Sequence, residues 1–287
     1  MTVRKAIIPC AGFGTRFLPI TKVMPKELLP IADVPALSHI IKEAADSGIE
    51  EVLVIISPQK KQIKKLFKPN RSLNSLLLKR GDRESFALAN EQYGVSVSFA
   101  VQRKMNGNGM AVRLGKRFAG GEPVAVMFGD DVVYTGEDSP VTKQLINAYK
   151  ATGGASIVGC QRTSEDIARR CGVMIASEKT CDKLTRISGI EEKPKGELPS
   201  NLVSLGRFIL APEIFDAIDR AKVTDGEVYL TDAICILAER GDVYACEFEG
   251  RRYDVGNKEG YLEAVVEYSL RDGKLGDGFR KYLDNIK

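Results

Sequence analysis

Short runs rich in β-branched residues alternate with helix-period segments along the first half of the chain. The runs RKAIIPC, EEVLVIIS, VSVSFAVQ, EPVAVMFGDD and ASIVGCQ predict strands, and the segments 34–48, 59–67, 109–118 and 140–151 predict helices. Alternation of this kind is typical of a parallel sheet with helices on both faces. In such folds ligands bind at the carboxyl ends of the strands, where side chains that follow different strands can meet.

The second half of the chain has a different pattern. Strands are expected at GVMIAS, LTRISGI and LVSLGRFIL, followed by a helix at VYLTDAICILAER and a strand at DVYACEFEG. The segment 68–94 is polar and weakly helical, which indicates an excursion outside the main sheet. The tail 258–287 predicts helices whose apolar face is either a core contact or an oligomer contact. We therefore expect an α/β fold with a Rossmann-like, mostly parallel mixed sheet, a smaller strand-rich part and a C-terminal helical segment.

The composition is that of an ordinary globular protein. The 287 residues are 44% hydrophobic and 28% charged, which is enough to bury a large core. A net charge of +4 from 42 basic and 38 acidic residues, without a basic run, disfavours nucleic-acid binding and suits a mildly cationic pocket for anionic substrates. No signal-peptide pattern or membrane-spanning apolar run is present, so we expect a cytoplasmic location and no membrane partner.

The positions of the cysteines and of the one histidine indicate that both residue types are structural. We expect the cysteines to be reduced core residues of an intracellular protein rather than disulfides or a zinc site. They are scattered without a CxxC pair, at Cys10, Cys160, Cys171, Cys181, Cys235 and Cys246. His39 lies in an apolar helix pattern and is expected to be structural, which disfavours histidine-based catalysis.

The segment KAIIPCAGFGTRFLPITKVMPKELLP joins an apolar strand to a glycine-rich turn and two cations. Gly12 and Gly14 carry no Cβ and can adopt positive φ angles, so their N–H groups can approach phosphate oxygens or a base edge. Arg16 and Lys26 place positive charge beside the turn, a combination that suits a triphosphate. Pro19, Pro25 and Pro30 exclude one uninterrupted helix after the turn and indicate an ordered loop that holds Lys26 and Glu27.

A GxG turn after a strand is not specific on its own. It is equally compatible with a plain structural turn or with a dinucleotide-binding fingerprint. The third glycine of that fingerprint would fall at Phe17, and the GK[ST] ending of a P-loop is absent.

With its continuation PxTKxxPKELLP, the segment resembles the signature of the sugar-1-phosphate nucleotidylyltransferases. The matching positions are Ala11, Gly12, Gly14, Thr15, Arg16, Pro19, Thr21, Lys22, Pro25, Lys26, Glu27 and Pro30. The KELLP form and the 68–94 segment are most similar to the uridylyltransferase group of that superfamily, and the resemblance covers nearly the whole chain. It implies a homo-oligomer, dimer or tetramer, that converts UTP and glucose 1-phosphate into UDP-glucose and pyrophosphate.

Two carboxylates, Asp130 and Asp131, follow the apolar strand PVAVMFG. Carboxylates beside phosphates are the ligands that Mg²⁺ prefers, although an aspartate pair after a strand is equally common as a turn or helix cap. The resemblance implies that Asp130 holds Mg²⁺ together with Asp254 of RRYDVGNKEGY, and it places Asp131 at a variable position.

The motif IEEKPK carries a charge pair that in isolation is typical of a solvated surface. The resemblance implies that Glu192 accepts hydrogen bonds from sugar hydroxyls, that Lys193 holds the sugar phosphate and that Gly172 approaches the glucose ring. Arg207 matches a family arginine to which no role is assigned.

For the nucleotide, the resemblance implies a set that frames uracil and the phosphates. Its members are Ala11, Gly12, Gly14, Thr15, Glu27, Gln102 and Gly107. A glutamine amide offers the donor and the acceptor that the base edge requires. Met110 departs from the pattern, because uridylyltransferases commonly have histidine there and thymidylyltransferases glutamine. We therefore expect only a modest preference for UTP over dTTP.

The expected reaction is an in-line displacement that needs no protein nucleophile, because positioning and charge neutralisation carry phosphoryl transfer. Arg16, Lys26 and Lys193 are the expected catalytic cations. We expect a single domain over 1–287, with a nucleotide-binding part at 1–160, a sugar-phosphate-binding part at 161–257 and C-terminal helices at 258–287. The alternatives are a thymidylyltransferase or dual-base enzyme, a non-catalytic nucleotide-sugar-binding regulator and a dinucleotide-dependent oxidoreductase.

Overall fold

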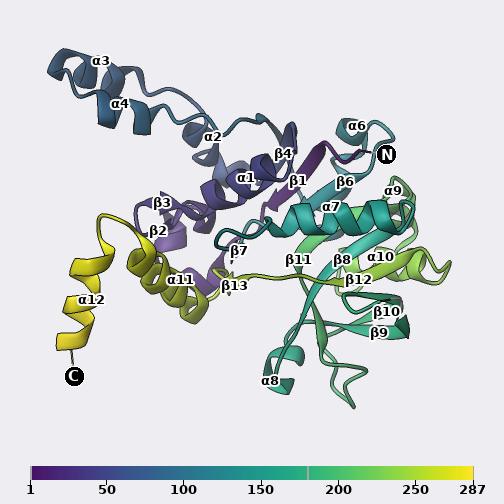
Figure 1. Cartoon of the computed structure of the whole chain (residues 1–287). Helices are drawn as coiled ribbons and strands as arrows, with labels where there is room; N and C mark the ends of the chain where they lie inside the picture. Colours follow the sequence, from purple (N-terminus) through teal and green to yellow (C-terminus); the bar gives the residue numbers. More distant parts are fainter. Residues whose placement is uncertain (1, 180, 287) are drawn as a thin grey trace.

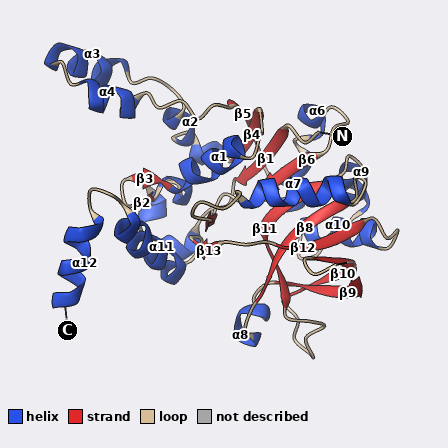
Figure 2. Ribbon diagram, in the orientation of Figure 1, coloured by secondary structure: helices blue, strands red, loops and turns tan. Residues whose placement is uncertain are grey.

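A mixed sheet with helices on both faces forms the centre of the molecule, as the computed structural model of the chain shows (Figures 1 and 2). The structure describes residues 2–179 and 181–286; Met1, Thr180 and Lys287, which belong to the expected 1–287 domain, lie outside the described residues. The strands are β1 (Lys5–Cys10), β2 (Pro30–Ile31), β3 (Val34–Pro35), β4 (Glu51–Ile56), β5 (Ser96–Val101), β6 (Val124–Met127), β7 (Asp131–Tyr134), β8 (Ser156–Arg162), β9 (Gly172–Lys179), β10 (Leu184–Glu192), β11 (Leu202–Leu210), β12 (Val243–Glu247) and β13 (Arg251–Asp254).

The helices lie between these strands and at the carboxyl end of the chain. They are α1 (Ala36–Asp46), α2 (Ile63–Leu66), α3 (Arg71–Arg80), α4 (Arg83–Ala89), α5 (Asn108–Arg113), α6 (Lys116–Ala119), α7 (Val141–Ala151), α8 (Glu165–Ala168), α9 (Ile214–Arg220), α10 (Leu230–Ala238), α11 (Lys258–Arg271) and α12 (Gly276–Asn285). Four single 3₁₀ turns occur as well, η1 (Thr15–Phe17), η2 (Ile20–Lys22), η3 (Lys26–Leu28) and η4 (Pro58–Lys60).

The main sheet has nine strands in the order β5-β4-β1-β6-β11-β8-β12-β10-β9. Strands β5, β4, β1 and β6 are parallel to one another, whereas β11 runs antiparallel to both of its neighbours and β10 runs antiparallel to β12 and β9. The expected α/β class and the mostly parallel mixed sheet are therefore confirmed. The carboxyl ends of β1, β5 and β6 meet at one edge of the parallel half.

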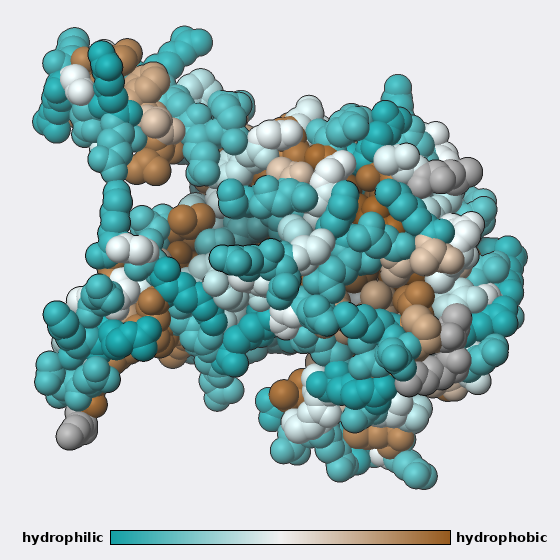
Figure 3. Space-filling view, in the orientation of Figure 1, coloured by the Kyte–Doolittle hydropathy of each residue, from teal (hydrophilic) through white to brown (hydrophobic). Residues whose placement is uncertain are grey.

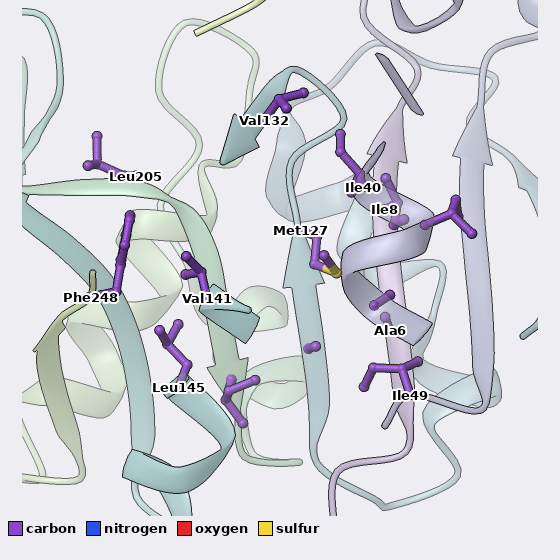
Figure 4. Close-up of a cluster of buried hydrophobic side chains, with 14 of the residues drawn as sticks. Ala6, Ile8, Ile40, Ile49, Met127, Val132, Val141, Leu145, Leu205 and Phe248 are labelled. Atoms are coloured by element: carbon purple, nitrogen blue, oxygen red, sulfur yellow. The ribbon is translucent and has the colours of Figure 1, made fainter. Parts of the chain in front are cut away.

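Both faces of the sheet are buried, as the alternation within β1 illustrates. Ala6 and Ile8 pack into one core with α1 and α7, while Ile7 points into a second core with α5, α9 and α10. Figure 4 shows Ile40 of α1 above Ala6 and Ile8, and Leu145 of α7 over the neighbouring strands. This double burial is the reason that the parallel strands are almost continuously apolar.

Several local elements differ from the sequence-based expectation. The 68–94 segment is an excursion, as predicted, but it consists of the well-formed helices α3 and α4, which extend away from the sheet (Figure 1). Helix 109–118 is divided into α5 and α6. The ribbon of β7 and β13 and the helices α8 and α9 were not expected, because runs of four to seven residues carry too few positions to define a period.

The apolar face of the first C-terminal helix, α11, is a core contact. Ala264 is fully buried, Tyr261 packs edge-on against Phe17, and Tyr268 packs against His39. The expectation that all cysteines lie in the core is wrong for Cys181, which is exposed, although all six are free thiols. In the part of the chain that the structure describes, no helix is long and apolar enough to cross a membrane.

Candidate active site

A cleft of about 440 Å³ opens at the carboxyl ends of β1, β5 and β6. Three segments predicted to follow strand ends meet in its walls: the glycine turn after β1, Gln102 after β5 and Asp130 after β6. The expected site residues that line it are Ala11, Gly12, Gly14, Thr15, Lys26, Glu27, Gln102, Gly107 and Asp130. Of the other expected residues, Arg16, Gly172, Glu192, Lys193 and Asp254 lie outside these described walls.

The glycine turn adopts a positive φ at one of its two glycines. Gly14 has φ 70° and precedes η1, whereas Gly12 is not left-handed and has open space around the position of a Cβ. The expectation of positive φ at Gly12 was therefore wrong, and its small size leaves room in the cleft instead. The Thr21 hydroxyl donates to the Gly14 carbonyl at 2.8 Å, which holds the turn against the following loop.

Lys26 and Asp130 form an ion pair across the cleft, between η3 and the end of β6. Burial disfavours both charges, but the charge of Asp130 raises the pKa of Lys26, and Lys26 in turn keeps the pKa of Asp130 below its ordinary value. Both groups are therefore ionised at neutral pH. About 29% of the Asp130 side chain stays exposed to the cleft, so its carboxylate is available to a ligand.

The carboxylate of Glu27 is buried in an ion pair, although the residue lines the cleft. Its two oxygens accept hydrogen bonds from Lys60 Nζ at 2.7 and 2.8 Å, and Glu27 is only 1% exposed. Burial raises the pKa of Glu27, while Lys60 and then Lys26 oppose that shift. Lys60 comes from η4 after β4, so this ion pair fixes the KELLP loop to the sheet.

The ribbon of β7 and β13 brings the two expected metal carboxylates together. Asp254 pairs with Asp131 in the antiparallel register. Gly256 lies between the two carboxylates: a Cβ there would come within 2.6 Å of Asp130 Oδ2 and 2.9 Å of Asp254 Oδ1. Asp130 and Asp254 therefore converge on one point, as the sequence had predicted for them.

Asp131 is held in a different way from its neighbour. It is 4% exposed and forms an ion pair with Arg252 of β13. Burial raises the pKa of Asp131 to about 6; Arg252 opposes this shift, and the nearby carboxylates of Asp130 and Asp254 add to it. Arg207 is fully buried, pairs with Glu43 at 2.8 Å and donates to the backbone carbonyl of Asp131. Arg207 therefore links β7 of the ribbon to Glu43 of α1.

The expected sugar residues lie together outside that cleft, where the ends of β9 and β10 pair beside α10; Gly172, Glu192 and Lys193 are called the sugar wall below. Gly172 pairs with Glu192 in the β9–β10 register, and a Cβ on Gly172 would come within 3.0 Å of a Glu192 carboxylate oxygen. Burial and then Asp232 raise the pKa of Glu192 against the opposing charge of Lys193. Lys193 is exposed with φ 49°, a conformation uncommon for a residue with a side chain and enriched at functional sites.

Two hydrogen bonds fix the side chain of Gln102 in the cleft wall. Its Nε2 donates to the Asn106 side chain at 3.1 Å and to the Gly107 carbonyl at 3.0 Å, and the residue is 6% exposed. Met110, by contrast, packs against the second core and does not belong to the cleft walls that the structure describes.

Comparison with known proteins gives the family. A model of the family described as "Nucleotidyl transferase" matches residues 5–270. This chain belongs to the nucleotidyl transferase family. A UTP–glucose-1-phosphate uridylyltransferase of Staphylococcus haemolyticus is 39% identical over 289 residues, which span 99% of this chain and 98% of that protein. One of Staphylococcus saprophyticus is 38% identical over 289 residues, 100% of this chain and 99% of that protein.

Two solved structures are similar to this nucleotidyl transferase over most of its length. The UTP-bound UGPase from Acinetobacter baumannii superposes with a TM-score of 0.92 at 30% identity, covering 100% of both chains. A UDP-glucose pyrophosphorylase complexed with UDP-glucose superposes with a TM-score of 0.84 at 33% identity, covering 94% of this chain and 100% of that one.

The donor set of this nucleotidyl transferase fits a hard divalent cation. Asp130 and Asp254 supply carboxylate oxygens that converge over Gly256. Within residues 2–179 and 181–286, no group of three or more His, Cys, Asp or Glu side chains is placed to hold a metal. Two carboxylates completed by phosphate oxygens and water are the arrangement that suits Mg²⁺.

Sequence reasoning missed Lys60, Arg252 and Asn108, each of which has a defined contact in this site. Lys60 and Arg252 neutralise buried carboxylates, and the Asn108 side chain accepts a hydrogen bond from the Leu230 amide at 2.8 Å. A lysine within the run QKKQIKK and an arginine within RRYD carry no local signal of burial. The partners of all three lie more than thirty positions away in the sequence, so no spacing rule could have found them.

Proposed function

We propose that this chain makes UDP-glucose and pyrophosphate from UTP and glucose 1-phosphate. The observation that carries the proposal is the convergence of Lys26, Asp130 and Asp254 at the mouth of a cleft that also contains the glycine turn. An oxygen of the sugar phosphate attacks the α-phosphorus in line, and pyrophosphate leaves. Such a transfer depends on alignment and charge neutralisation rather than on a protein nucleophile.

Each cation has a distinct part in this proposal. Lys26 and Arg16 neutralise the triphosphate and then the leaving pyrophosphate; the exposed position of Arg16, within η1, lets it close on the phosphates when they bind. Lys193 holds the phosphate of the sugar and orients its oxygen. Glu192 accepts hydrogen bonds from sugar hydroxyls, and the missing Cβ of Gly172 lets the Glu192 carboxylate lie against the backbone of β9.

Mg²⁺ is the metal that we assign to Asp130 and Asp254. When bound, Mg²⁺ supplies charge neutralisation between the two phosphates that react. Lys26, which contacts Asp130 Oδ2, keeps this carboxylate ionised and aimed into the cleft before substrates arrive. Mn²⁺ and Co²⁺ are the alternative metals, and measuring activity as each of the three metals is titrated into the metal-free protein distinguishes them.

For the nucleotide, we assign the base to Gln102, Gly107, Ala11 and Gly12, and the phosphates to Gly14 and Thr15. Glu27 contributes through its ion pair with Lys60, which fixes the loop that carries Lys26. Uracil and thymine differ by one methyl group, for which discrimination is about 1–3 kcal/mol. We therefore propose a preference for UTP over dTTP of about ten- to a hundredfold, with dual use of both nucleotides as the second candidate.

The test is pyrophosphate release from UTP, dTTP, ATP and GTP, each with glucose 1-phosphate and Mg²⁺, with UDP-glucose identified as the product. Turnover with UTP supports the proposal, and a clear preference for dTTP assigns the chain to the thymidylyl reaction instead. Absence of turnover with all four nucleotides would replace the enzyme by a nucleotide-sugar-binding regulator, which binding of UDP-glucose without turnover would identify.

The remaining proposals concern the whole chain. We assign residues 1–160 to the nucleotide, 161–257 to the sugar phosphate and 258–287 to the C-terminal helices within one domain. We also propose a homo-oligomer, because exposed apolar side chains gather on the projecting helices: Leu78 and Leu88 on α3 and α4, and Tyr282 on α12. A cytoplasmic location stays a prediction, which cell fractionation tests.

A further inference from the structure

The loop that frames the base is joined to the segment that leads into α10. The Val228 amide donates to the Asn106 carbonyl at 2.9 Å, and the Gly109 amide donates to the Val228 carbonyl at 2.9 Å. Gly107 has φ 101°, and a Cβ at Gly107 would collide with the backbone of Val228. The two segments, 118 or more positions apart at these contacts, therefore lie against each other with no room for a side chain between them.

One side chain in this contact reaches the helix itself. Asn108 lines the nucleotide cleft, and its Oδ1 accepts a hydrogen bond from the amide of Leu230, the first residue of α10, at 2.8 Å. The residue before α10, Tyr229, provides no side-chain cap to its own helix. Asn108 thus satisfies one of the free amides at the start of a helix that belongs to another part of the chain.

Helix α10 in turn supports the sugar wall. Thr231, next to the capped amide, lies beside Gly172, since a Cβ on Gly172 would be 3.7 Å from the Thr231 methyl group. The Ile190 amide contacts Cys235 Sγ of α10 at 3.2 Å, two positions before Glu192. A displacement of α10 therefore moves the strand end from which Glu192 and Lys193 project.

We propose that Asn108 is a positioning residue that couples the nucleotide cleft to the sugar wall through the first turn of α10. This inference rests on the proposed function for the identity of the two substrates. Although Asn108 lines the nucleotide cleft, its removal is expected to raise KM for the sugar phosphate more than KM for the nucleotide. A residue that served only the nucleotide would have the opposite effect.

Three variants separate these possibilities. Asn108→Ala removes the acceptor, whereas Asn108→Asp retains an oxygen at the same place and adds a negative charge that a helix start favours. Asn106→Ala is the matched control, because the Asn106 side chain bonds to Gln102 while its contact with Val228 is made by the backbone. Steady-state kinetics with each substrate varied in turn give KM and kcat for all three.

Asn108→Ala is expected to raise KM for glucose 1-phosphate about two- to thirtyfold, the range that loss of a helix cap produces, with a smaller change in KM for UTP. Asn108→Asp is expected to restore the KM for glucose 1-phosphate. Asn106→Ala is expected to raise KM for UTP and to leave that for glucose 1-phosphate close to wild type. The proposal is overturned if Asn108→Ala affects UTP alone, or if the aspartate variant is as impaired as the alanine variant.

A second measurement does not depend on turnover. Hydrogen exchange of the full chain reports the protection of the Leu230 and Thr231 amides, which should fall in Asn108→Ala and remain in Asn106→Ala. Unchanged protection in Asn108→Ala overturns the coupling whatever the reaction is. If the wild-type protein shows no turnover, while protection still falls in Asn108→Ala and remains in Asn106→Ala, the proposed reaction is refuted and the coupling stands.

Discussion

Asp130 and Asp131 are adjacent in the chain, but their surroundings give them separate roles. Asp130 keeps 29% of its side chain exposed and points to the same place as Asp254, whereas Asp131 is 4% exposed and bonded to Arg252. The difference arises because β7 begins at Asp131 and its register turns that side chain toward β13. At the scale of single residues, the position of each aspartate relative to the start of β7 therefore decides whether its carboxylate is open to the cleft or held by Arg252.

The two aspartates therefore predict different substitution effects on activity. Asp130→Asn is expected to lower kcat by about two orders of magnitude or more, since the carboxylate that we propose as a Mg²⁺ ligand loses its charge, and to cost about 1–3 kcal/mol of stability because Lys26 loses its charged partner. Asp131→Asn is expected to lower the free energy of unfolding by about 1–3 kcal/mol because Arg252 loses a charged partner. Activity assays and urea unfolding check both variants, and a severe activity loss in Asp131→Asn alone would place the metal on the other carboxylate.

Lys60 gives a second prediction at this scale, because it is the main cation on the buried carboxylate of Glu27. Removing one partner of a buried pair typically costs about 3–5 kcal/mol, whereas removing both is much milder. Lys60→Met should therefore be strongly destabilised in urea unfolding, and the double variant Lys60→Met/Glu27→Gln should regain most of the loss. A double variant no more stable than Lys60→Met would show that Lys60 acts through another contact.

His39 predicts how stability depends on pH. Burial lowers the pKa of His39 to about 4, and Nε2 has no hydrogen-bond partner among the described residues. In the unfolded chain the imidazole binds a proton below about pH 6.5. The unfolded state then holds more protons, so the stability present above pH 6.5 falls as the pH drops toward 4, by up to about 3 kcal/mol.

Because His39 is the only histidine of the chain, its imidazole resonance can be followed directly by NMR between pH 7.5 and 4.5. A midpoint near 6.5 in the folded protein would contradict the prediction. Urea unfolding of His39→Phe should lose most of the corresponding pH dependence while retaining the contact with Tyr268.

At the scale of elements, the long strands and helices and the continuously apolar β6 could be predicted, whereas most of the short elements could not. The β1–α1–β4 alternation was read correctly because each of these elements spans at least six residues with a clear period. The β7–β13 ribbon was missed since its two strands have four residues each and pair across more than 100 positions. That ribbon is what brings Asp254 to Asp130, so the two carboxylates were singled out without the element that joins them.

The site followed the same division. Residues that follow apolar strands, such as Gln102 after β5 and Asp130 after β6, were predicted to converge because parallel strands present their carboxyl ends at one edge. The orientation of Glu27 could not be predicted, because it depends on a lysine that follows a different strand. The sequence also did not show that helical rotation within α5 turns Met110 to the core while Asn108 and Ala111 face the cleft.

At the scale of the whole molecule, the sheet forms one body and two helical parts extend from it. Figure 1 shows α3 and α4 on one side and α12 near the C-terminus, both away from the sheet. Figure 3 shows brown, hydrophobic atoms on these projecting parts. Helix α12 carries Phe279 and Tyr282 three positions apart, and its C-cap residue Ile286 follows, with Tyr282 61% and Ile286 58% exposed. An amphipathic helix with an uncovered apolar side gains stability when a second surface buries that side.

This arrangement predicts that α12 takes part in association of the chain. Sedimentation of the wild type should give a multiple of the 31.4 kDa chain mass, and the pair Tyr282→Glu/Ile286→Glu should shift it toward the single chain without unfolding the sheet. Val223→Glu is the control, because Val223 is also 61% exposed but lies in the connection between α9 and α10. It adds one charge at an equally exposed position where the α12 pair adds two, so a shift in both variants would point to a general charge effect. A shift confined to α12 identifies this helix as an interface, whereas no shift in either variant means that the copies associate through another surface or that the chain is a monomer.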